Sequence, residues 1–295
     1  MKLFLSKASK NNNQLNESAI LNDPWIINFE KLDINMQSRI GHGTFSSVYK
    51  GILHGEIPLY NICKDMNLQL YSKANSNISI SNGISVAVKL ALAHATEKDL
   101  RDFQKEIEIM KILEYHLNVI CMYGYTISKF IPHIILEYCD LGDLRKYITS
   151  IKNNEPENDG SYMKEWMLFA CQICSGMCYI ASKGIIHRDL AARNVLLTKD
   201  RIAKISDFGM SIRINNDENQ YENNHRLLPV RWSAPETFGL KSFSEKSDVW
   251  SFGVTIWELF SFGEIPYKGI ASADLQKYLM DGNRLEKPKI CDDQM

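Results

Sequence analysis

The fold is decided by residues 187–194, His-Arg-Asp-Leu-Ala-Ala-Arg-Asn, and by residues 207–209, Asp-Phe-Gly, which begin eighteen residues after Asp189. Asp189, Asn194 and Asp207 supply a carboxylate base and further oxygen ligands within one short stretch. Metal-assisted phosphoryl transfer requires those groups close together. The two runs therefore predict a site for that chemistry.

A glycine-rich run, residues 41–48 (Gly-His-Gly-Thr-Phe-Ser-Ser-Val), lies between two predicted strands. Gly41 and Gly43 would let backbone N–H groups approach phosphate oxygens with no Cβ in the way. A tight hairpin turn explains the glycines equally well, so this run alone leaves both interpretations open. Ser46 stands where the full pattern has a third glycine.

Lys89 ends an apolar strand, Val86-Ala87-Val88, where a lysine needs a partner or an anionic ligand. A helix is predicted over residues 96–113, because apolar residues recur there at helical spacing and its start resembles a capping box. Glu106 borders the apolar stripe of this helix and is within reach of Lys89. The alternative is a surface lysine and a solvated glutamate.

With residues 234–236 (Ala-Pro-Glu) and 247–253 (Ser-Asp-Val-Trp-Ser-Phe-Gly), these runs resemble those of eukaryotic protein kinases, and among them tyrosine kinases of the receptor type. The resemblance covers about Leu32 to Met295. It implies an α+β, two-lobed protein kinase fold. The small N-lobe would be an antiparallel β-sheet plus one helix, and the larger C-lobe would be mainly α-helical.

The resemblance also implies boundaries along the chain. A polar N-terminal tail is expected over residues 1–30, an N-lobe over 31–138 with an irregular insertion at about 53–85, and a C-lobe over 139–295. Members of the family continue for about 40 residues beyond the matching point, so the C-lobe is expected to lack its last helices. An arginine in those helices pairs with the glutamate that matches Glu236, which predicts a poorly compensated buried carboxylate here.

The resemblance assigns roles to individual residues. Asp189 would be the catalytic base, Arg193 would supply positive charge near the γ-phosphate, and Lys89, paired with Glu106, would bind the α- and β-phosphates of ATP. Asn194 and Asp207 would hold Mg²⁺. The other ATP-binding residues would be Gly41 and Gly43 over the phosphates, the main chain of Glu137 and Cys139 at the adenine edge, and Ile40, Val48, Ala87 and Leu196 as apolar walls.

Three features favour tyrosine as the phosphate acceptor. Ala191 occupies the position where serine/threonine kinases commonly carry a lysine, and Arg193 follows it. Residues 228–232 (Leu-Pro-Val-Arg-Trp) resemble the substrate platform of tyrosine kinases, where a proline offers a flat apolar face to a phenol ring. Residues 247–253 match the tyrosine-kinase form of the central helix.

Tyr221 lies in the polar loop between Asp207 and Glu236. We expect it to be a regulatory phosphosite, because a phosphate there would add about −1.5 to −2 charge and could pair with arginines such as Arg188. An ordinary exposed tyrosine is the alternative. The expected partners are proteins that bear tyrosine, and the family resemblance is compatible with self-association for trans-autophosphorylation.

Two other functions stay open at this point. A kinase-fold scaffold without activity is favoured by the expected truncation, whereas the intact set Lys89, Asp189, Asn194 and Asp207 argues against it. A serine/threonine or dual-specificity kinase is opposed by Ala191 with Arg193 and by Pro229.

Composition limits the cellular setting. The 34 basic and 35 acidic side chains give a net charge of −1, so no bulk charge argues for nucleic acid or membrane binding. Neither a membrane span nor a signal-peptide core is expected, so a cytoplasmic, cytosol-facing location is predicted.

Two segments are apolar on nearly every face and are expected to be buried helices: residues 166–180 and 249–260. The first contains Cys171, Cys174 and Cys178, which we expect to pack in the core as small hydrophobic side chains. Because seven cysteines are an odd number in a long chain, a disulfide framework is not expected.

Overall fold

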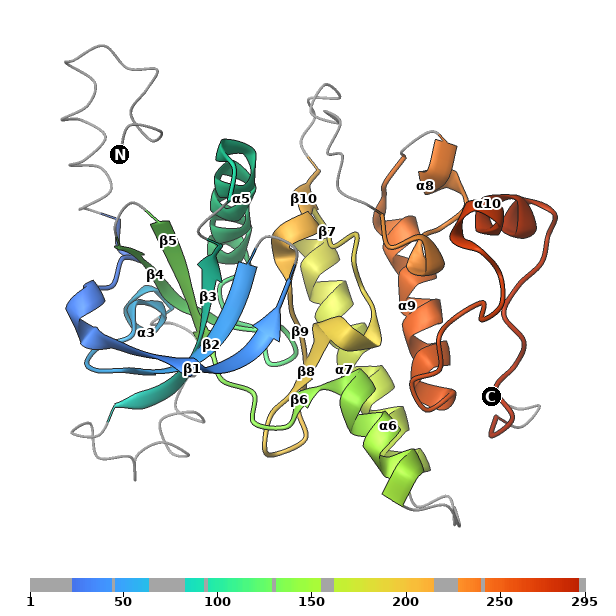
Figure 1. Cartoon of the computed structure of the whole chain (residues 1–295), viewed down its shortest axis with the longest axis horizontal. Coiled ribbons are helices and arrows are strands. Elements are labelled where there is room, and N and C mark those ends of the chain that lie inside the picture. Colours follow the sequence, from blue (N-terminus) through green and yellow to red (C-terminus); the bar gives the residue numbers. More distant parts are fainter. Residues whose placement is uncertain are drawn as a thin grey trace. The chain divides into compact units, whose positions relative to one another are not determined.

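The computed structural model describes residues 23–43, 46–63, 83–92, 95–128, 131–154, 162–214, 228–239 and 242–291 (Figure 1). These residues form two compact units. Unit 1 comprises the described residues up to Tyr115 together with Cys121–Tyr138, and unit 2 comprises His116–Ile120 and the described residues from Cys139 onward.

Unit 1 is built on a five-stranded antiparallel sheet in the order β1-β2-β3-β5-β4 (Figure 1). Its strands are β1 (Leu32–His42), β2 (Ser46–Leu53), β3 (Ile84–Ala91), β4 (Met122–Ser128) and β5 (Ile131–Glu137). The β-branched residues Val86 and Val88 of β3 are fully buried, as suits a strand at the centre of a sheet. The register pairs Lys89 with Val48 of β2 and with Ile134 of β5.

Helix α5 (Glu97–Leu113) packs against strands of this sheet. Its N-terminus carries the predicted capping box: the Thr96 hydroxyl accepts the Asp99 N–H, and the Asp99 carboxylate accepts the Thr96 N–H at 2.8 Å. Such a cap satisfies N–H groups that a helix start otherwise leaves unpaired. The buried face includes Phe103, Ile107 and Met110, so the predicted helix and its core-facing stripe are confirmed.

The predicted polar tail is wrong for residues 23–30. The Ile27 N–H donates to the Tyr125 carbonyl and the Tyr125 N–H donates to the Trp25 carbonyl, so this segment extends the edge of the sheet along β4. Trp25 and Ile27 are buried. The Asp23 carboxylate joins the segment to α5 through Lys111, at 2.6 Å. Two apolar side chains and one ion pair therefore hold a segment whose composition looks polar.

The insertion is not irregular throughout. Helix α3 (Pro58–Ile62) begins at a proline, which is well suited to the first turn of a helix because its missing N–H has no partner there. Ile57, Leu59 and Cys63 are buried around it. Residues 64–82 lie outside the described part of the chain.

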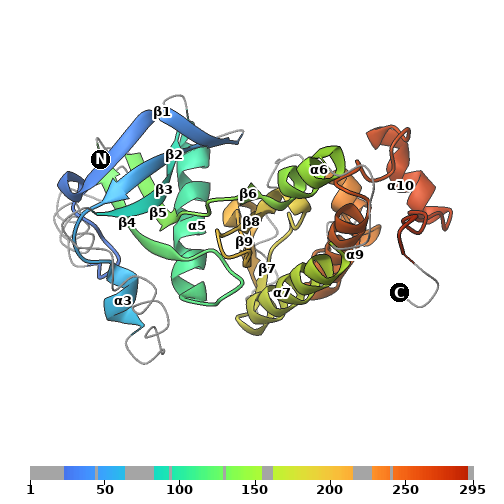
Figure 2. The same ribbon diagram turned by 90° about the horizontal axis from the view of Figure 1, so that it is seen from below.

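Unit 2 is mainly helical (Figure 2). Helices α7 (Met163–Ser182) and α6 (Leu144–Asn154) both pack against α9 (Glu245–Phe260). The shorter helices are α8 (Glu236–Gly239) and α10 (Ser272–Met280). Two small sheets complete the unit: β6 (Gly142–Asp143), β8 (Val195–Leu197) and β9 (Ala203–Ile205) in one, and β7 (Ile185–Ile186) with β10 (Ile212–Arg213) in the other.

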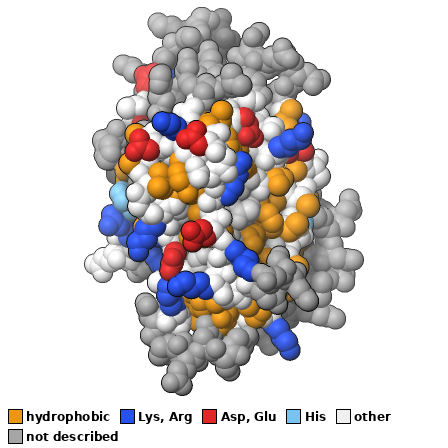
Figure 3. All heavy atoms as spheres, turned by 90° about the vertical axis from the view of Figure 1, so that its right-hand side faces the viewer, with side chains coloured by type: hydrophobic (Ala, Val, Ile, Leu, Met, Phe, Trp, Pro, Cys, Tyr) orange, Lys and Arg blue, Asp and Glu red, His pale blue; other side chains and the backbone are white. Residues whose placement is uncertain are grey.

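The side chains that α9 buries are largely polar. Its buried residues include Ser247, Asp248, Thr255 and Glu258, whereas Val249 is 67% exposed. The expectation that this apolar segment would be buried on all faces is therefore wrong in part. On the face where α10 lies, hydrophobic and charged side chains are intermingled (Figure 3).

Candidate active site

In unit 1, the structure joins the predicted pair Lys89 and Glu106. Lys89 Nζ lies 2.6 Å from Glu106 Oε1, and both side chains are almost completely buried. Strand β3 supplies the lysine and helix α5 the glutamate. Because burying either charge alone is costly, the pairing offsets the burial of both side chains.

The glycine-rich turn lies at the adjoining ends of β1 and β2. Gly41 pairs with Val48, and a Cβ on Gly41 would lie 3.3 Å from the Val48 Cβ, so the strands approach closely here. The Gly43 N–H donates to the Ser46 carbonyl at 2.8 Å. Thr44 and Phe45 lie outside the described residues. The described residues on either side of the turn are compatible with either interpretation of its glycines.

The predicted adenine-binding residues are distributed over both units. In unit 1, Ile40 is exposed, Val48 is half-buried and Ala87 is buried. The Glu137 N–H donates to the Cys121 carbonyl at 3.0 Å, and Glu137 pairs with Val86 of β3. In unit 2, Cys139 is buried, and Leu196 is half-buried in β8.

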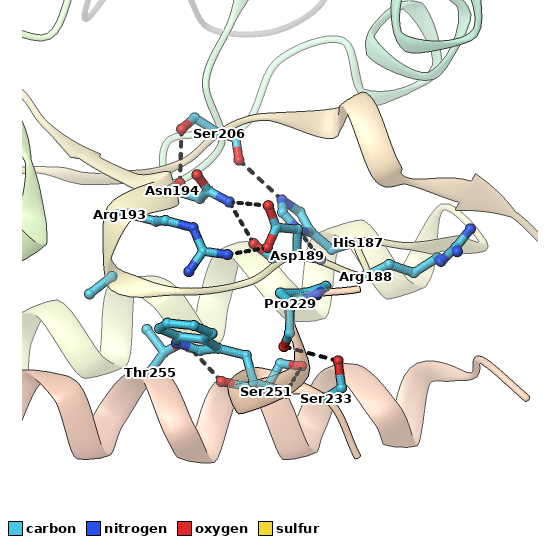
Figure 4. Close-up of polar contacts among 12 residues, drawn as sticks. His187, Arg188, Asp189, Arg193, Asn194, Ser206, Pro229, Ser233, Ser251 and Thr255 are labelled. Atoms are coloured by element: carbon cyan, nitrogen blue, oxygen red, sulfur yellow. Dashed lines mark hydrogen bonds and ion pairs between the residues drawn. The ribbon is translucent and has the colours of Figure 1, made fainter. Parts of the chain in front are cut away.

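In unit 2, Asp189 is the centre of a hydrogen-bonded loop (Figure 4). Its Oδ2 accepts a bond from Asn194 Nδ2 at 2.8 Å, and its Oδ1 accepts one from the Arg193 guanidinium. Asn194 Nδ2 also donates to the Asp189 carbonyl at 2.7 Å. The loop thus brings three of the predicted residues together and fixes both oxygens of the carboxylate.

Burial is the main cause that raises the pKa of Asp189, and the nearby Asp207 carboxylate raises it further. The Arg193 charge and the Asn194 hydrogen bond act in the opposite direction. A carboxylate with a raised pKa is a stronger proton acceptor than a solvated aspartate, which suits a general base.

Asp248 of α9 accepts two hydrogen bonds from the backbone of this loop. Its Oδ2 accepts the His187 N–H at 2.7 Å and its Oδ1 accepts the Arg188 N–H at 3.0 Å. Arg188 has a φ of 69°, a left-handed conformation that is unfavourable for a side-chain-bearing residue. Asp248 therefore stabilises a strained backbone two residues before Asp189.

Glu258, also on α9, joins the loop to the predicted substrate platform. Its Oε2 accepts the Ala192 N–H at 2.9 Å and Trp232 Nε1–H at 2.8 Å. The Arg193 guanidinium lies 4.3 Å from the centroid of the Trp232 ring, a cation–π contact. Glu258, Trp232, Arg193 and Asp189 thus form a continuous chain of contacts.

Asp207 opens a short 3-10 helix, Phe208–Met210, and itself has a left-handed backbone with φ 66° and ψ 76°. Its side chain is exposed, while Phe208 is buried and packs edge-on against the His187 ring at 5.1 Å. The buried phenylalanine fixes the backbone that presents the Asp207 carboxylate.

The side-chain oxygens of Asn194 and Asp207 suit a Mg²⁺ ion that is bound together with phosphate groups. Among the residues that the structure describes, no group of three or more His, Cys, Asp or Glu side chains is arranged to hold a metal. Mg²⁺ commonly uses one or two carboxylates plus phosphate oxygens and water. Asn194 directs its Nδ2 to Asp189, so its Oδ1 is the atom that could join Asp207 as a ligand.

Comparison with known proteins agrees with this geometry. Residues 34–295 match the model of the family described as protein tyrosine and serine/threonine kinase. The chain belongs to this family. The resemblance inferred from its motifs and the two-lobed α+β fold class are confirmed.

Three relatives give the similarity in more detail. The tyrosine kinase receptor Cad96Ca of Drosophila melanogaster is 40% identical over 231 residues, 76% of this chain and 30% of the relative. Fibroblast growth factor receptor 1 of Pleurodeles waltl is 39% identical over 219 residues, 71% of this chain and 27% of the relative. A Caenorhabditis elegans relative is 38% identical over 294 residues, 95% of this chain and 33% of its own length. The kinase chain therefore spans about a third of the length of these proteins.

The predicted substrate platform of this kinase is anchored at both ends. The Arg231 guanidinium donates to the carbonyls of Pro266, Tyr267 and Ile270 at 2.7–2.8 Å. The Ser233 hydroxyl donates to the Pro229 carbonyl at 3.1 Å, and Pro229 itself is half-buried. Tyr221, the predicted phosphosite, lies outside the described residues.

Sequence reasoning missed the two acids of α9 and misplaced one glutamate. Asp248 and Glu258 stand ten residues apart in a segment that looks like an apolar helix. An acidic residue in a helix that is predicted to be buried needs hydrogen-bond donors, and this requirement is the sequence signal that could have identified both residues. Glu236, expected as a buried carboxylate, is exposed at the first residue of α8.

Replacing Glu258 with glutamine tests how burial acts on this acid. Burial is the main cause that raises the pKa of Glu258, and no described residue forms a hydrogen bond with its Oε1. The folded state therefore binds the proton more tightly than the unfolded state, so the contribution of Glu258 to stability falls as the pH rises above 4.5. We expect the free energy of unfolding of Glu258→Gln, relative to that of the wild type, to increase as the pH rises from 4.5 to 7. Urea unfolding at several pH values measures this difference, and a constant difference would contradict the assignment.

Proposed function

We propose that this chain is the catalytic domain of a protein-tyrosine kinase, which transfers the γ-phosphoryl group of ATP to tyrosine hydroxyls of proteins. The observation that carries the proposal is the Asp189 carboxylate, fixed through both oxygens by Arg193 and Asn194. Kinase catalysis depends mainly on positioning and charge stabilisation, and this loop supplies both.

In the proposed reaction, Asp189 accepts the proton of the tyrosine hydroxyl as that oxygen bonds to the γ-phosphorus and the bond from the γ-phosphorus to the bridging oxygen of ADP breaks. Arg193 keeps the carboxylate aligned and adds positive charge beside the transferred group. Mg²⁺, held by Asn194 and Asp207, would neutralise phosphate charge. In unit 1, the Lys89 ammonium, oriented by Glu106, would bind the α- and β-phosphates.

Tyrosine specificity is supported by the loop and the platform together. Ala191 is buried and carries no charge where a serine/threonine kinase has a lysine. The positive charge comes instead from Arg193, which rests on the Trp232 ring next to the platform. A longer substrate side chain would therefore be needed to reach Asp189, and an aromatic one would find the apolar face of Pro229.

We extend the proposal to receptor-type signalling, with the domain on the cytosolic side of a membrane, because two relatives are named as receptors. The substrates would be proteins bearing tyrosine, and Tyr221 would be a site of trans-autophosphorylation between two copies. No role in binding nucleic acid is proposed. Within the described part of the chain, no helix has the length and apolarity needed to cross a membrane.

The experiment that tests the proposal is phosphoryl transfer from labelled ATP with Mg²⁺ to a Glu/Tyr copolymer, beside a protein substrate that offers only serine and threonine. We expect phosphotyrosine as the product by phosphoamino-acid analysis. Phosphoserine or phosphothreonine alone would overturn the substrate class. No transfer by protein that is folded by circular dichroism would favour a scaffold.

Lys89→Met tests the role of unit 1. The variant removes the proposed phosphate ligand and leaves the Glu106 carboxylate buried without its lysine. Since removal of one oriented charge-stabilising donor commonly costs about 10²–10³ in kcat, we expect a loss of that size in the transfer assay. Lys277→Met, at an exposed lysine of α10, is the control and should behave as wild type. Equal activity of the two variants would remove Lys89 from the mechanism.

A further inference from the structure

Three cysteines on α7 lie on the surface and not in the core. Cys171, Cys174 and Cys178 are exposed, which contradicts the expectation from sequence. The helix buries a different stripe, formed by Trp166, Phe169, Ile173, Gly176 and Ile180. At about 100° per residue, the cysteines fall on the opposite side of the helix. An apolar helix therefore presents a row of thiols outward.

Two of these thiols contact each other. Cys174 and Cys178 are four residues apart, which makes them neighbours on a helix surface, and their side chains share a hydrogen bond. Partial desolvation and the neighbouring Cys178 and Cys171 thiols raise the pKa of Cys174. The pair is thus a close dithiol, and the raised pKa keeps the Cys174 sulfur protonated at neutral pH.

We propose that Cys174 and Cys178 form a two-sulfur binding site for a soft monovalent metal ion of the Cu(I) class. Thiolates are the ligands that soft ions select, and a pair of sulfurs suffices for two-coordinate binding. Zinc and iron–sulfur centres need more donors, and no described group of three or more metal-binding side chains has a suitable arrangement. Binding forms two metal–sulfur bonds and releases two protons to solvent, so neither an oxidant nor a reductant is required.

The site is separate from the phosphoryl-transfer machinery. The thiols project from the exposed face of α7, whereas the opposite face packs against β7, β9 and α9, which hold the Asp189 loop. Substitution of an exposed residue generally changes stability little, so Cys→Ser variants should fold as the wild type does. Metal binding can therefore be measured independently of kinase activity.

The test is titration of the reduced, full 295-residue chain with Cu(I) in competition with a chromophoric Cu(I) chelator. We expect one tightly bound ion per chain. Because changes in the outer shell of a metal site alone cost about 10–100-fold in affinity, loss of one of only two ligands should weaken binding by at least about 100-fold in Cys174→Ser and in Cys178→Ser. Cys171→Ser is the matched control on the same face and should keep the ion.

Affinity should also rise with pH, because the thiols must lose protons to bind. The proposal is overturned if the wild type binds no ion, if either Cys174→Ser or Cys178→Ser keeps it, or if Cys171→Ser loses it. X-ray absorption of the loaded chain adds an independent readout: two sulfur neighbours are expected, and three would contradict the two-sulfur site. Circular dichroism of each variant confirms that the helix is intact.

Discussion

Asp189→Asn is expected to lower kcat by about 10²–10⁴-fold, the contribution that a positioned general base typically makes. Asparagine keeps the shape of the side chain but cannot accept the substrate proton. It also places an amide group opposite Asn194 Nδ2, which now donates to a carboxylate oxygen. Steady-state transfer to the Glu/Tyr copolymer measures the change. Asp200→Asn, at an exposed turn residue, is the matched control.

The pH dependence of the wild type checks the same residue. Because burial raises the pKa of Asp189, the carboxylate takes up its proton at a higher pH than a solvated aspartate, whose ordinary value is 3.8. As the pH is lowered, activity should therefore fall at a pH at which an ordinary aspartate is still ionised. A kcat/KM profile that stays flat down to pH 4 would contradict the raised pKa of the base.

Asp248→Ala is expected to destabilise the fold by about 2–6 kcal/mol, since two buried backbone N–H groups each lose an acceptor at about 1–3 kcal/mol. Those N–H groups belong to His187 and Arg188, and the strained Arg188 backbone would lose its support. Burial raises the pKa of Asp248, which shows that the desolvated carboxylate is itself unfavourable. Because alanine removes this unfavourable charge, we expect a loss of stability in the lower part of the range of about 2–6 kcal/mol, that is, about 2–4 kcal/mol. Against a typical domain stability of about 5–15 kcal/mol, the loss remains large.

Urea unfolding measures this loss, and two further variants make it interpretable. Asp248→Asn keeps one carbonyl oxygen as an acceptor and should lose less stability than alanine does. Asp274→Ala, at an exposed residue of α10, should change stability by less than about 0.5 kcal/mol. If Asp248→Ala were as stable as Asp274→Ala, the support of the loop by α9 would be refuted.

The sequence predicted the local chemistry well because that chemistry is contained in short runs. Residues 187–194 include Asp189, Arg193 and Asn194, and a loop of this length necessarily keeps them close. The Lys89–Glu106 pair was accessible because a buried lysine demands a partner and the next helix offered one. Periodicity and a cap were enough to locate α5.

The sequence predicted burial poorly where a helix is apolar all round. For α7 it could not tell which face the core would take, so Cys171, Cys174 and Cys178 were assigned to the wrong side. The same ambiguity hid the polar core of α9, where Asp248 and Glu258 are buried because backbone N–H groups far away in sequence need acceptors. Such partners are set by tertiary packing, which no local pattern reports.

The central claim is that Asp189, fixed by its loop, carries phosphoryl transfer to tyrosine. Rapid-quench measurement of a single turnover, with enzyme in excess over labelled ATP, isolates the chemical step from product release. We predict that Asp189→Asn slows this step by about 10²–10⁴-fold while the affinity for ATP stays within about threefold of the wild type. Equal single-turnover rates for the two proteins would contradict the account.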